Sequence, residues 1–401
     1  MKVAGIVIEL PKTWQWANCS EVIDVRDGTH ETPKYVSEGY PLVTSKNLKP
    51  DGIDFSTISY ISEKDHLEIS KRSRVDRNDI LFAMIGTIGN PVLVDIDTEF
   101  SIKNVALFKF ANSPIDPRYF RYLLKTRIIE RQLDFEERGG TQKFVSLKVL
   151  RNMKIPYPPL EEQRRIAAIL DKADGVRRKR KEAIRLTEEL LKSTFLEMFG
   201  DPVTNPKGWE IKKLEEVTTK ITDGVHSRPN YTEQGVPFIS VKDITTGELK
   251  FDDCKFISEE DHKKYKKRCN PDMGDILYTK VGATYGRPAL VNVKSEFSLY
   301  VSVCLIKPQR DLIFPEFLKE ALATPALKSQ ADRSIKGIGV PDLHLNMIKD
   351  FIVPVPPIYK QKEFLEIASK IQFSKESLTS CSQESENLFN SLLQRAFRGE
   401  L

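Results

Sequence analysis

The chain has 401 residues, of which 40% are hydrophobic and 30% are charged, so it is long enough for two or three globular domains. Its 62 basic and 57 acidic residues give a net charge of only +5, which does not by itself indicate a nucleic-acid partner. No apolar run approaches the roughly 20 residues that span a bilayer, and the first residues lack a secretory signal pattern. The five dispersed cysteines favour neither a disulfide framework nor a zinc finger. We therefore expect a cytoplasmic protein with no membrane partner and no bound metal.

A tandem duplication organises the whole chain. The hexapeptide ISEKDH at 61–66 recurs as ISEEDH at 257–262, and DGTH at 27–30 recurs as DGVH at 223–226. Longer matches join NDILFAMIG at 78–86 to GDILYTKVG at 274–282, and IPYPPLEEQ at 155–163 to VPVPPIYKQ at 353–361. The offset stays between 196 and 198 residues, which is too long a period for a solenoid. Each copy is therefore expected to form a domain with its own core.

The elements follow the same order in each copy. Short apolar runs bounded by Gly, Pro and Asn predict strands, as at 80–85, 105–110 and 289–293. The stretch 117–133 has helical spacing, with a proline near its start. The proline-rich segments IPYPP and VPVPP that follow predict extended connectors, because proline removes a donor and restricts the residue before it.

Each copy ends in a long helix, predicted over 160–199 and 359–397. Apolar residues recur there at spacings of three and four, which favours pairing with another helix. Gly175 lies inside the first helix and weakens it by about 1 kcal/mol relative to alanine, so a kink is expected there. If the two helices pair antiparallel, a pseudo-two-fold axis relates the domains. Such an axis matches a DNA duplex, on which two unlike domains would bind two unlike half-sites.

The junctions carry a resemblance to a known family. The stretches RGGTQKFVSLKVLRNMKIPYPPLEEQ at 138–163 and PPLEEQRRIAAIL at 158–170 resemble the specificity subunits of type I restriction–modification enzymes. The resemblance implies a mixed α/β fold with two target-recognition domains, 1–155 and 201–354. Two long conserved spacer helices, 156–200 and 355–401, would pair as an antiparallel coiled coil. The second junction keeps the prolines and the glutamine but lacks the paired arginines of the first.

The resemblance also implies a function. The chain would be a non-catalytic, sequence-specific DNA-binding subunit that recognises a bipartite, asymmetric target in double-stranded DNA. Two methyltransferase subunits would dock on its helices, and restriction subunits could join them. S-adenosylmethionine, ATP and Mg²⁺ are then expected only on the partner subunits, and we assign no catalytic residue to this chain.

Candidate DNA-binding residues lie in loops and basic runs of both copies. The Asp-Gly turns, the runs KRSR and KKYKKR, and the glycine-containing loops before the junctions combine positive charge with close backbone approach. Structural loops and solvated charged faces are the alternative interpretations. The candidates are His30, Lys34, Tyr35, Arg72, Arg74, Gln142, Lys143, His226, Arg228, Asn230, Tyr231, Lys267, Arg268 and Lys336.

Candidate partner-binding residues lie on the first long helix. They could face a partner's acidic groups, the DNA between half-sites, or solvent, and they are Arg164, Arg165, Arg177, Arg178 and Arg180. His66 and His262 follow acidic residues and could bind a cation with them. The alternative is an exposed turn or helix start, capped by the serine of each ISExDH string.

Two other classes of function remain open. A stand-alone DNA methyltransferase would need an Asn/Asp-Pro-Pro-aromatic loop and a glycine-rich cofactor turn, and neither is present. The sequence contains no P-loop, so ATP-driven work by this chain is not expected. A non-catalytic structural adaptor would explain the helices but not the twin domains with basic loops. Binding to random DNA duplexes would separate the adaptor from the DNA-binding subunit.

Overall fold

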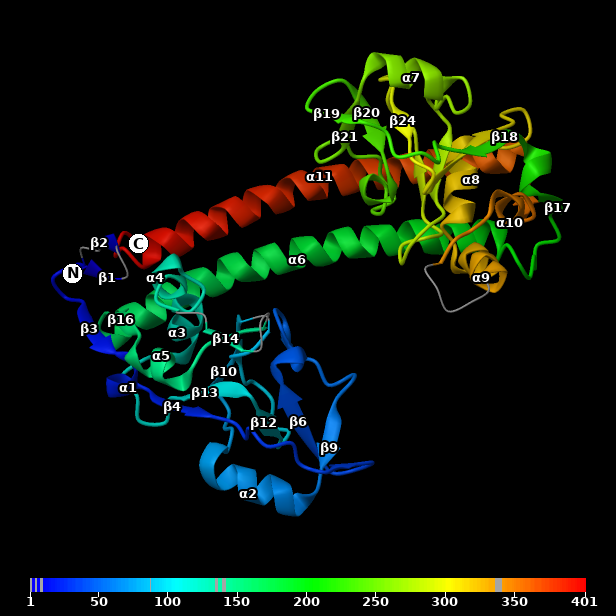
Figure 1. Cartoon of the computed structure of the whole chain (residues 1–401). Helices are drawn as coiled ribbons and strands as arrows, with labels where there is room; N and C mark the ends of the chain where they lie inside the picture. Colours follow the sequence, from blue (N-terminus) through cyan, green and yellow to red (C-terminus); the bar gives the residue numbers. More distant parts are fainter. Residues whose placement is uncertain are drawn as a thin grey trace. The chain divides into compact units, whose positions relative to one another are not determined.

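The computed structural model describes residues 2–3, 6–7, 10–86, 88–133, 136–138, 142–335 and 341–401, with the backbone alone at 2–3, 6–7, 136–138 and 142–143. The chain divides into two compact units: unit 1 is Met1–Lys181 with Ser380–Leu401, and unit 2 is Glu182–Thr379. Each unit combines the sheet-containing part of one repeat with part of each long helix (Figure 1).

Unit 1 contains two four-stranded sheets. The first is antiparallel, in the order β11-β10-β13-β4. The second, β12-β6-β9-β5, has one parallel pair, β12 with β6. The strands are β4 Asp24–Asp27, β5 Tyr35–Val36, β6 Tyr40–Thr44, β9 Ser59–Ile61, β10 Ile80–Ala83, β11 Gly89–Leu93, β12 Ser101–Lys103 and β13 Val105–Lys109.

Unit 2 repeats both sheets with the same topology, in the orders β18-β25-β22-β23 and β19-β21-β20-β24. The parallel pair recurs as β20 with β24. The duplication inferred from the sequence is therefore a duplication of fold. The strands are β18 Thr218–Asp223, β19 Tyr231–Thr232, β20 Val236–Ile239, β21 Lys255–Ile257, β22 Ile276–Thr279, β23 Pro288–Leu290, β24 Ser298–Leu299 and β25 Val303–Pro308.

Short elements complete each unit. In unit 1 they are β1 Lys2–Val3, β2 Ile6–Val7, β3 Gln15–Asn18, α1 Cys19–Val22, η1 Ser45–Asn47, β7 Leu48–Lys49, β8 Gly52–Ile53, α2 Glu63–Ser73, α3 Pro117–Leu123, α4 Arg127–Glu130, β14 Glu136–Arg138, β15 Gln142–Phe144, α5 Leu147–Asn152 and β16 Lys154–Tyr157. In unit 2 they are β17 Glu210–Lys213, η2 Leu214–Val217, η3 Val241–Asp243, α7 Glu259–Lys266, α8 Pro315–Leu322, α9 Pro325–Ser334, α10 Leu345–Lys349 and β26 Ile352–Val355.

The helix predicted over 117–133 is two short helices, α3 and α4. The break falls at Thr126, whose hydroxyl donates to the carbonyl oxygen of Leu123 at 2.7 Å and closes the first helix. Thr126 then takes the cap position of α4. A threonine that bonds back to the chain in this way competes with a continuous helix.

The proline-rich segments do more than connect. They form strands β16 and β26, which pair antiparallel with β3 and β17 in two-stranded sheets. Proline is tolerated there because an edge strand leaves one side of its backbone unpaired. The interpretation as plain connectors was therefore wrong, although the extended conformation was predicted correctly.

A buried glutamine fixes each long helix to its domain. The side-chain oxygen of Gln163 accepts from the Asp116 amide at 2.8 Å, and its nitrogen donates to the carbonyl oxygens of Pro114 and Pro158. Gln361 makes the equivalent three bonds in unit 2, to Phe314, Leu312 and Pro356. Because every polar atom of these buried amides is paired, the repeated glutamine orients the start of the helix.

The long helices are α6 Leu160–Phe199 and α11 Ile358–Ala396, close to the predicted bounds. Helix α6 runs through Gly175 as one continuous helix. In unit 1, the order of the contacts is antiparallel: Arg177 bonds Glu386, and further along α6 Arg180 bonds the earlier Ser385. In unit 2, Phe195 packs on Phe364 and Glu188 pairs with Lys375, which is again antiparallel. The predicted antiparallel pairing is thus confirmed within each unit.

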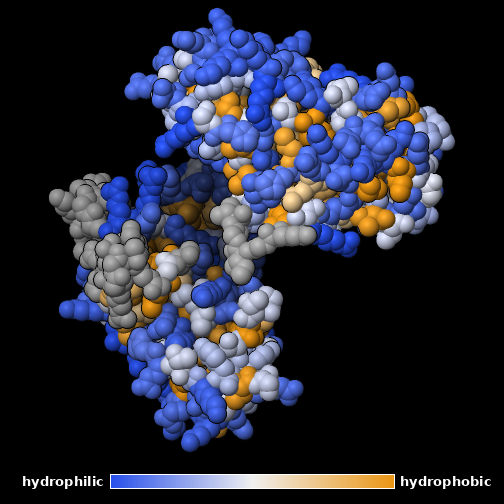
Figure 2. All heavy atoms as spheres, turned by 45° about the vertical axis from the view of Figure 1, so that its right-hand side comes forward, coloured by the Kyte–Doolittle hydropathy of each residue, from blue (hydrophilic) through white to orange (hydrophobic). Residues whose placement is uncertain are grey.

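Both units have their own hydrophobic cores, which share no residue. The surface visible in Figure 2 is mostly hydrophilic, with smaller apolar areas among the charged side chains. In the part of the chain that the structure describes, no helix is long and apolar enough to cross a membrane.

Candidate nucleic-acid interface

The two Asp-Gly turns follow strands that occupy the same place in their sheets. Asp27 ends β4 and Asp223 ends β18, and both side chains are buried. The next residue must be glycine, because a Cβ atom on Gly28 would lie 2.2 Å from the carbonyl oxygen of Ile102. On Gly224 the same atom would lie 2.0 Å from the Leu299 oxygen. This close approach brings the residues after the turn against the neighbouring sheet.

In unit 1 the buried carboxylate of Asp27 contacts two exposed side chains, those of His30 and Arg72. The Nε2 atom of His30 lies 3.0 Å from one Asp27 oxygen, and Nη2 of Arg72 donates to the other. The second ring nitrogen of His30, Nδ1, lies 3.1 Å from the side-chain oxygen of Asn104. We call Asp27, His30 and Arg72 the unit 1 cluster.

Unit 2 brings the same three residue types together, but here the arginine and the histidine contact one carboxylate oxygen and lie within 3.2 Å of each other. Nη2 of Arg268 donates to an Asp223 carboxylate oxygen at 2.5 Å, and Nε2 of His226 lies 3.3 Å from the same oxygen. We call Asp223, His226 and Arg268 the unit 2 cluster. Each member lies 196 positions after its counterpart, at 27 and 223, 30 and 226, and 72 and 268.

A buried lysine distinguishes the second cluster. Lys280 is only 4% exposed, and its Nζ atom lies 3.4 Å from Asp223 and 3.5 Å from Asp342. Lys280 follows β22 as Met84 follows β10, so unit 1 has a neutral side chain at that place. The two clusters therefore share their outward-facing groups and differ in what lies beneath them.

The other predicted DNA-binding residues are spread around these clusters. Lys34, Tyr35, Arg228, Asn230 and Lys267 are exposed, and Arg74 is exposed with Asp76 and Glu99 as ion-pair partners. The Tyr231 ring is partly exposed, with the Lys255 ammonium 4.1 Å from its centre, a cation–π contact. Gln142 and Lys143 lie in β15, where the structure describes only the backbone, and Lys336 lies outside the described residues.

Three of the predicted partner-binding arginines make contacts inside unit 1. Arg177 bridges Asp174 and Glu386, and its guanidinium lies 4.4 Å from the Phe389 ring centre. Arg180 donates to the Ser385 hydroxyl and to the Cys381 carbonyl oxygen. Arg178 pairs with Asp174 at 3.3 Å. Arg177 and Arg180 therefore help to join α6 to α11, whereas Arg178 pairs within α6, and a role in binding another protein stays a prediction.

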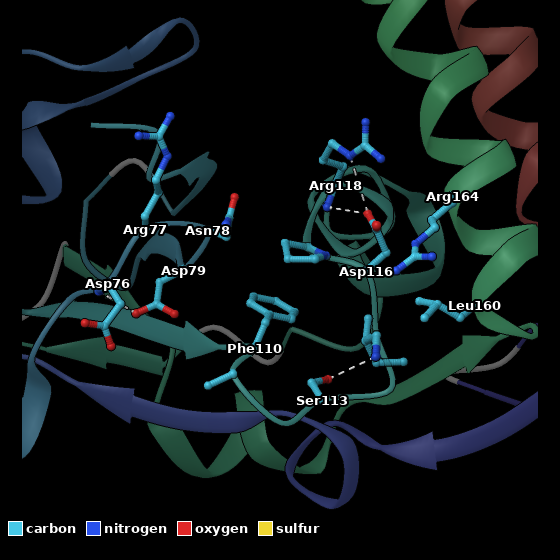
Figure 3. A pocket seen from close by; sticks show the side chains of 13 residues that line it. Asp76, Arg77, Asn78, Asp79, Phe110, Ser113, Asp116, Arg118, Leu160 and Arg164 are labelled. Atoms are coloured by element: carbon cyan, nitrogen blue, oxygen red, sulfur yellow. Dashed lines mark hydrogen bonds and ion pairs between the residues drawn. The ribbon is translucent and has the colours of Figure 1, made fainter. Parts of the chain in front are cut away.

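The remaining two arginines lie at the start of α6. Arg165 pairs with Glu162. Arg164 is exposed at the rim of a pocket of about 430 Å³ in unit 1. In Figure 3, Arg118 and Arg164 lie on one side of this pocket and Arg77 on the other. Arg77 and Arg118 both form ion pairs with aspartates, so the pocket is not a simple cationic site.

The histidines of the ISExDH strings are buried and structural. His66 and His262 are each 2.9 Å from a serine hydroxyl, that of Ser101 or Ser298. The predicted helix start is confirmed, since both histidines lie near the start of α2 or α7, but the expected exposure was wrong, because the rings are buried against the sheet. The capping was correct, since the hydroxyls of Ser62 and Ser258 accept the amides of Asp65 and Asp261.

The described residues contain no candidate metal site, and the buried thiol of Cys269 is a poor nucleophile. Across the described residues, no group of three or more His, Cys, Asp or Glu side chains could hold a metal ion. Burial raises the pKa of the Cys269 thiol to about 12, which disfavours the reactive thiolate form.

Comparisons with known proteins agree with the duplicated organisation of the chain. The family described as "Type I restriction modification DNA specificity domain" matches residues 11–186 and again residues 206–380. The type I restriction enzyme EcoBI specificity subunit of Escherichia coli is 27% identical over 293 residues, which cover 65% of this chain. They cover 61% of that protein, which is less than two thirds of its length. The type I restriction enzyme MjaVIII specificity subunit of Methanocaldococcus jannaschii is 22% identical over 414 residues, or 98% of this chain and 94% of that protein.

Two solved structures share the fold. One is a chain from work on complex assembly and conformational transition of the type I R-M system, with a TM-score of 0.57, 22% identity, and coverage of 98% of this chain and 100% of that chain. The other is the S subunit of a type I restriction–modification system from M. genitalium, with a TM-score of 0.55, 16% identity, and 99% of each chain covered. Since the family matches twice and covers most of the sequence, the chain belongs to the type I restriction–modification DNA specificity family.

Proposed function

We propose that this chain is the DNA-recognising subunit of a type I restriction–modification assembly. Each unit would bind one half of a bipartite target in double-stranded DNA. Because the two units differ in sequence, the halves of the target would differ as well.

The observation that carries the proposal is the paired cluster. Each unit presents an exposed arginine and histidine, held by a buried aspartate at the same place in the same fold. An arginine near the end of a helix and a histidine on a loop beside a sheet suit the phosphates of a duplex, and exposed side chains around them can contact base edges. A structural adaptor would not require this cationic surface twice, so that alternative is not favoured.

The chemistry would belong to partner subunits. Two methyltransferase subunits would dock on the helix pairs, with restriction subunits joining the assembly. S-adenosylmethionine, ATP and Mg²⁺ would then be bound by those partners. The exposed Arg164 beside the start of α6 is one candidate contact, since an arginine can form a bidentate pair with a partner's carboxylate.

The test is an exchange of one target-recognition domain. Residues 205–352 are replaced by the matching segment of another family member, and bound sequences are selected from random DNA duplexes. We expect one half of the selected target to change and the other half to remain.

The reciprocal exchange of residues 11–152 is the matched control, and it should change the other half alone. An exchange that altered both halves together would refute separate reading by the two units. A chain that selected no sequence at all would refute the proposed function itself.

A further inference from the structure

The two clusters contain the same three residue types in two domains that differ in sequence. Around the shared Asp, His and Arg, the neighbouring residues differ: Asn104 contacts His30 in unit 1, whereas Lys280 lies beside Asp223 in unit 2. A group that read a base would have to differ between two unlike half-sites. The DNA backbone is the same in every half-site, so groups kept in both units suit a backbone phosphate.

The exposure of the arginine side chains distinguishes these clusters from structural ion pairs of the same domains. The repeat also keeps a second buried carboxylate, Asp79, which pairs with Lys109 at 2.8 Å. The Lys109 side chain is only 12% exposed, as expected for a pair that serves the interior. By contrast, the side chains of Arg72 and Arg268 are 62% and 53% exposed although their aspartates are buried.

The arginines also keep unused donors. In Arg72 and Arg268, the bonds to the aspartate are made by Nη2 alone. Among the described residues, Nε and Nη1 of both side chains have no hydrogen-bond partner. A guanidinium fixed at one nitrogen retains further N–H donors in a rigid plane, and these can bind phosphate oxygens.

Resting on the function proposed above, we propose that the two clusters are equivalent phosphate-binding sites. The buried carboxylates of Asp27 and Asp223 act as positioning residues, and the exposed Arg and His side chains bind one backbone phosphate at each site. Base recognition is then left to the residues around the clusters that differ between the units.

The first test removes the arginine charge. The full chain and its Arg72→Gln and Arg268→Gln variants are titrated with a mixed-sequence duplex over a range of salt concentrations. Each lost phosphate contact should make the negative slope of log K against log salt shallower by about 0.9. The double variant should therefore be shallower by about 1.8. The loss of DNA affinity should be the same for every DNA sequence.

The second test removes the positioning carboxylate. Asp27→Asn makes the chain more positive by one charge, so long-range electrostatics alone would tighten DNA binding. If Asp27 positions Arg72 and His30, binding should weaken instead, although both side chains remain. Asp79→Asn is the matched control, since it also removes a buried carboxylate and adds the same charge. That variant should keep the wild-type salt slope.

The outcomes are distinct. Salt slopes unchanged in both arginine variants, or tighter binding by Asp27→Asn, would overturn the phosphate sites while leaving DNA recognition intact. A changed preference at a single base pair with an unchanged slope would also overturn them, in favour of base contact. Absence of DNA binding by the wild-type chain would overturn the proposed function as well. Because Arg72 and Arg268 are exposed, their variants decide the matter even if Asp27→Asn fails to fold.

Discussion

At the scale of single residues, the repeat contains two kinds of histidine. His30 and His226 are exposed in the clusters, whereas His66 and His262 are buried beneath α2 and α7. His66 stacks on Tyr40, with ring centres 3.9 Å apart, and its Nδ1 faces the Ser101 hydroxyl. His262 has in addition a carboxylate, Glu296, 3.1 Å from its Nε2. The same letter in a repeated motif therefore has a different electrostatic setting in each unit.

The burial of His66 predicts a loss of stability in acid. Burial lowers the pKa of the His66 imidazole below its ordinary value, so the folded chain favours the neutral ring. The stability that the neutral His66 ring contributes is complete above its pKa in the unfolded state, near 6.5. It is lost as the pH falls through the lower pKa of the folded state. His66→Gln should reduce the decline in melting temperature between about pH 7.5 and 5.5. An identical decline in wild type and variant would contradict this assignment.

The sequence allowed the prediction of two of the three residues in each cluster. His30, Arg72, His226 and Arg268 could be proposed because charge and turn signals surround them. Asp27 and Asp223 were missed, although both are part of the repeated Asp-Gly turn. Arg72 and Asp27 are 45 positions apart, and only the packing of α2 beside β4 brings them together. The repeat was the available signal, since it keeps all three residues in the same register.

At the scale of elements, the long helices were predictable because their apolar stripes persist over many turns. The seam within each unit is different. In unit 2 it is a cluster of aromatic rings, in which Phe195, Phe199, Phe317 and Phe364 pack with ring centres 4.8–6.4 Å apart. In unit 1, Phe389 and Leu393 pack with Ile166 and Leu170. The pairing of the proline-rich strands was not predictable, because β3 and β17 are distant from them in sequence. The split of α3 from α4 depends on a local bond from the Thr126 hydroxyl to Leu123, which helical spacing does not indicate.

Helix α11 offers a matched pair of phenylalanines to test the seam of unit 2. Phe364 is fully buried, and Phe373, further along the same helix, is 75% exposed. Phe364→Ala should lower the free energy of unfolding by about 3–5 kcal/mol through lost burial and a residual cavity. Phe373→Ala should change it by less than about 0.5 kcal/mol. Denaturant unfolding of both variants checks this, and equal effects would show that the rings do not hold the helices together.

At the scale of the whole molecule, the units of the fold are not the repeats of the sequence. The repeat boundary falls after α6, near residue 200, but the units are divided within both long helices, at 181/182 and 379/380. Each unit takes the start of one helix and the end of the other. In unit 1, the last residues of the chain, including Phe389, Leu393 and Phe397, belong to the core built by the first repeat. The first repeat therefore depends on the C-terminal end of the chain for its packing.

This division predicts which fragments fold. Residues 182–379 are one continuous segment and contain every core residue of unit 2. Expressed alone, the segment should unfold cooperatively. Its removal, with Lys181 joined to Ser380 through a short glycine-rich turn, should leave a folded unit 1, since Arg180 already contacts the Cys381 carbonyl oxygen.

The control is residues 1–200, which keep the whole first repeat and the whole of α6 but lose Phe389, Leu393 and Phe397. Under conditions where ultracentrifugation shows a monomer, that fragment should melt at a lower temperature than the joined unit 1, because Ile166 and Leu170 then face water. If residues 1–200 proved as stable as the joined unit, the C-terminal end of α11 would not be part of the core of unit 1.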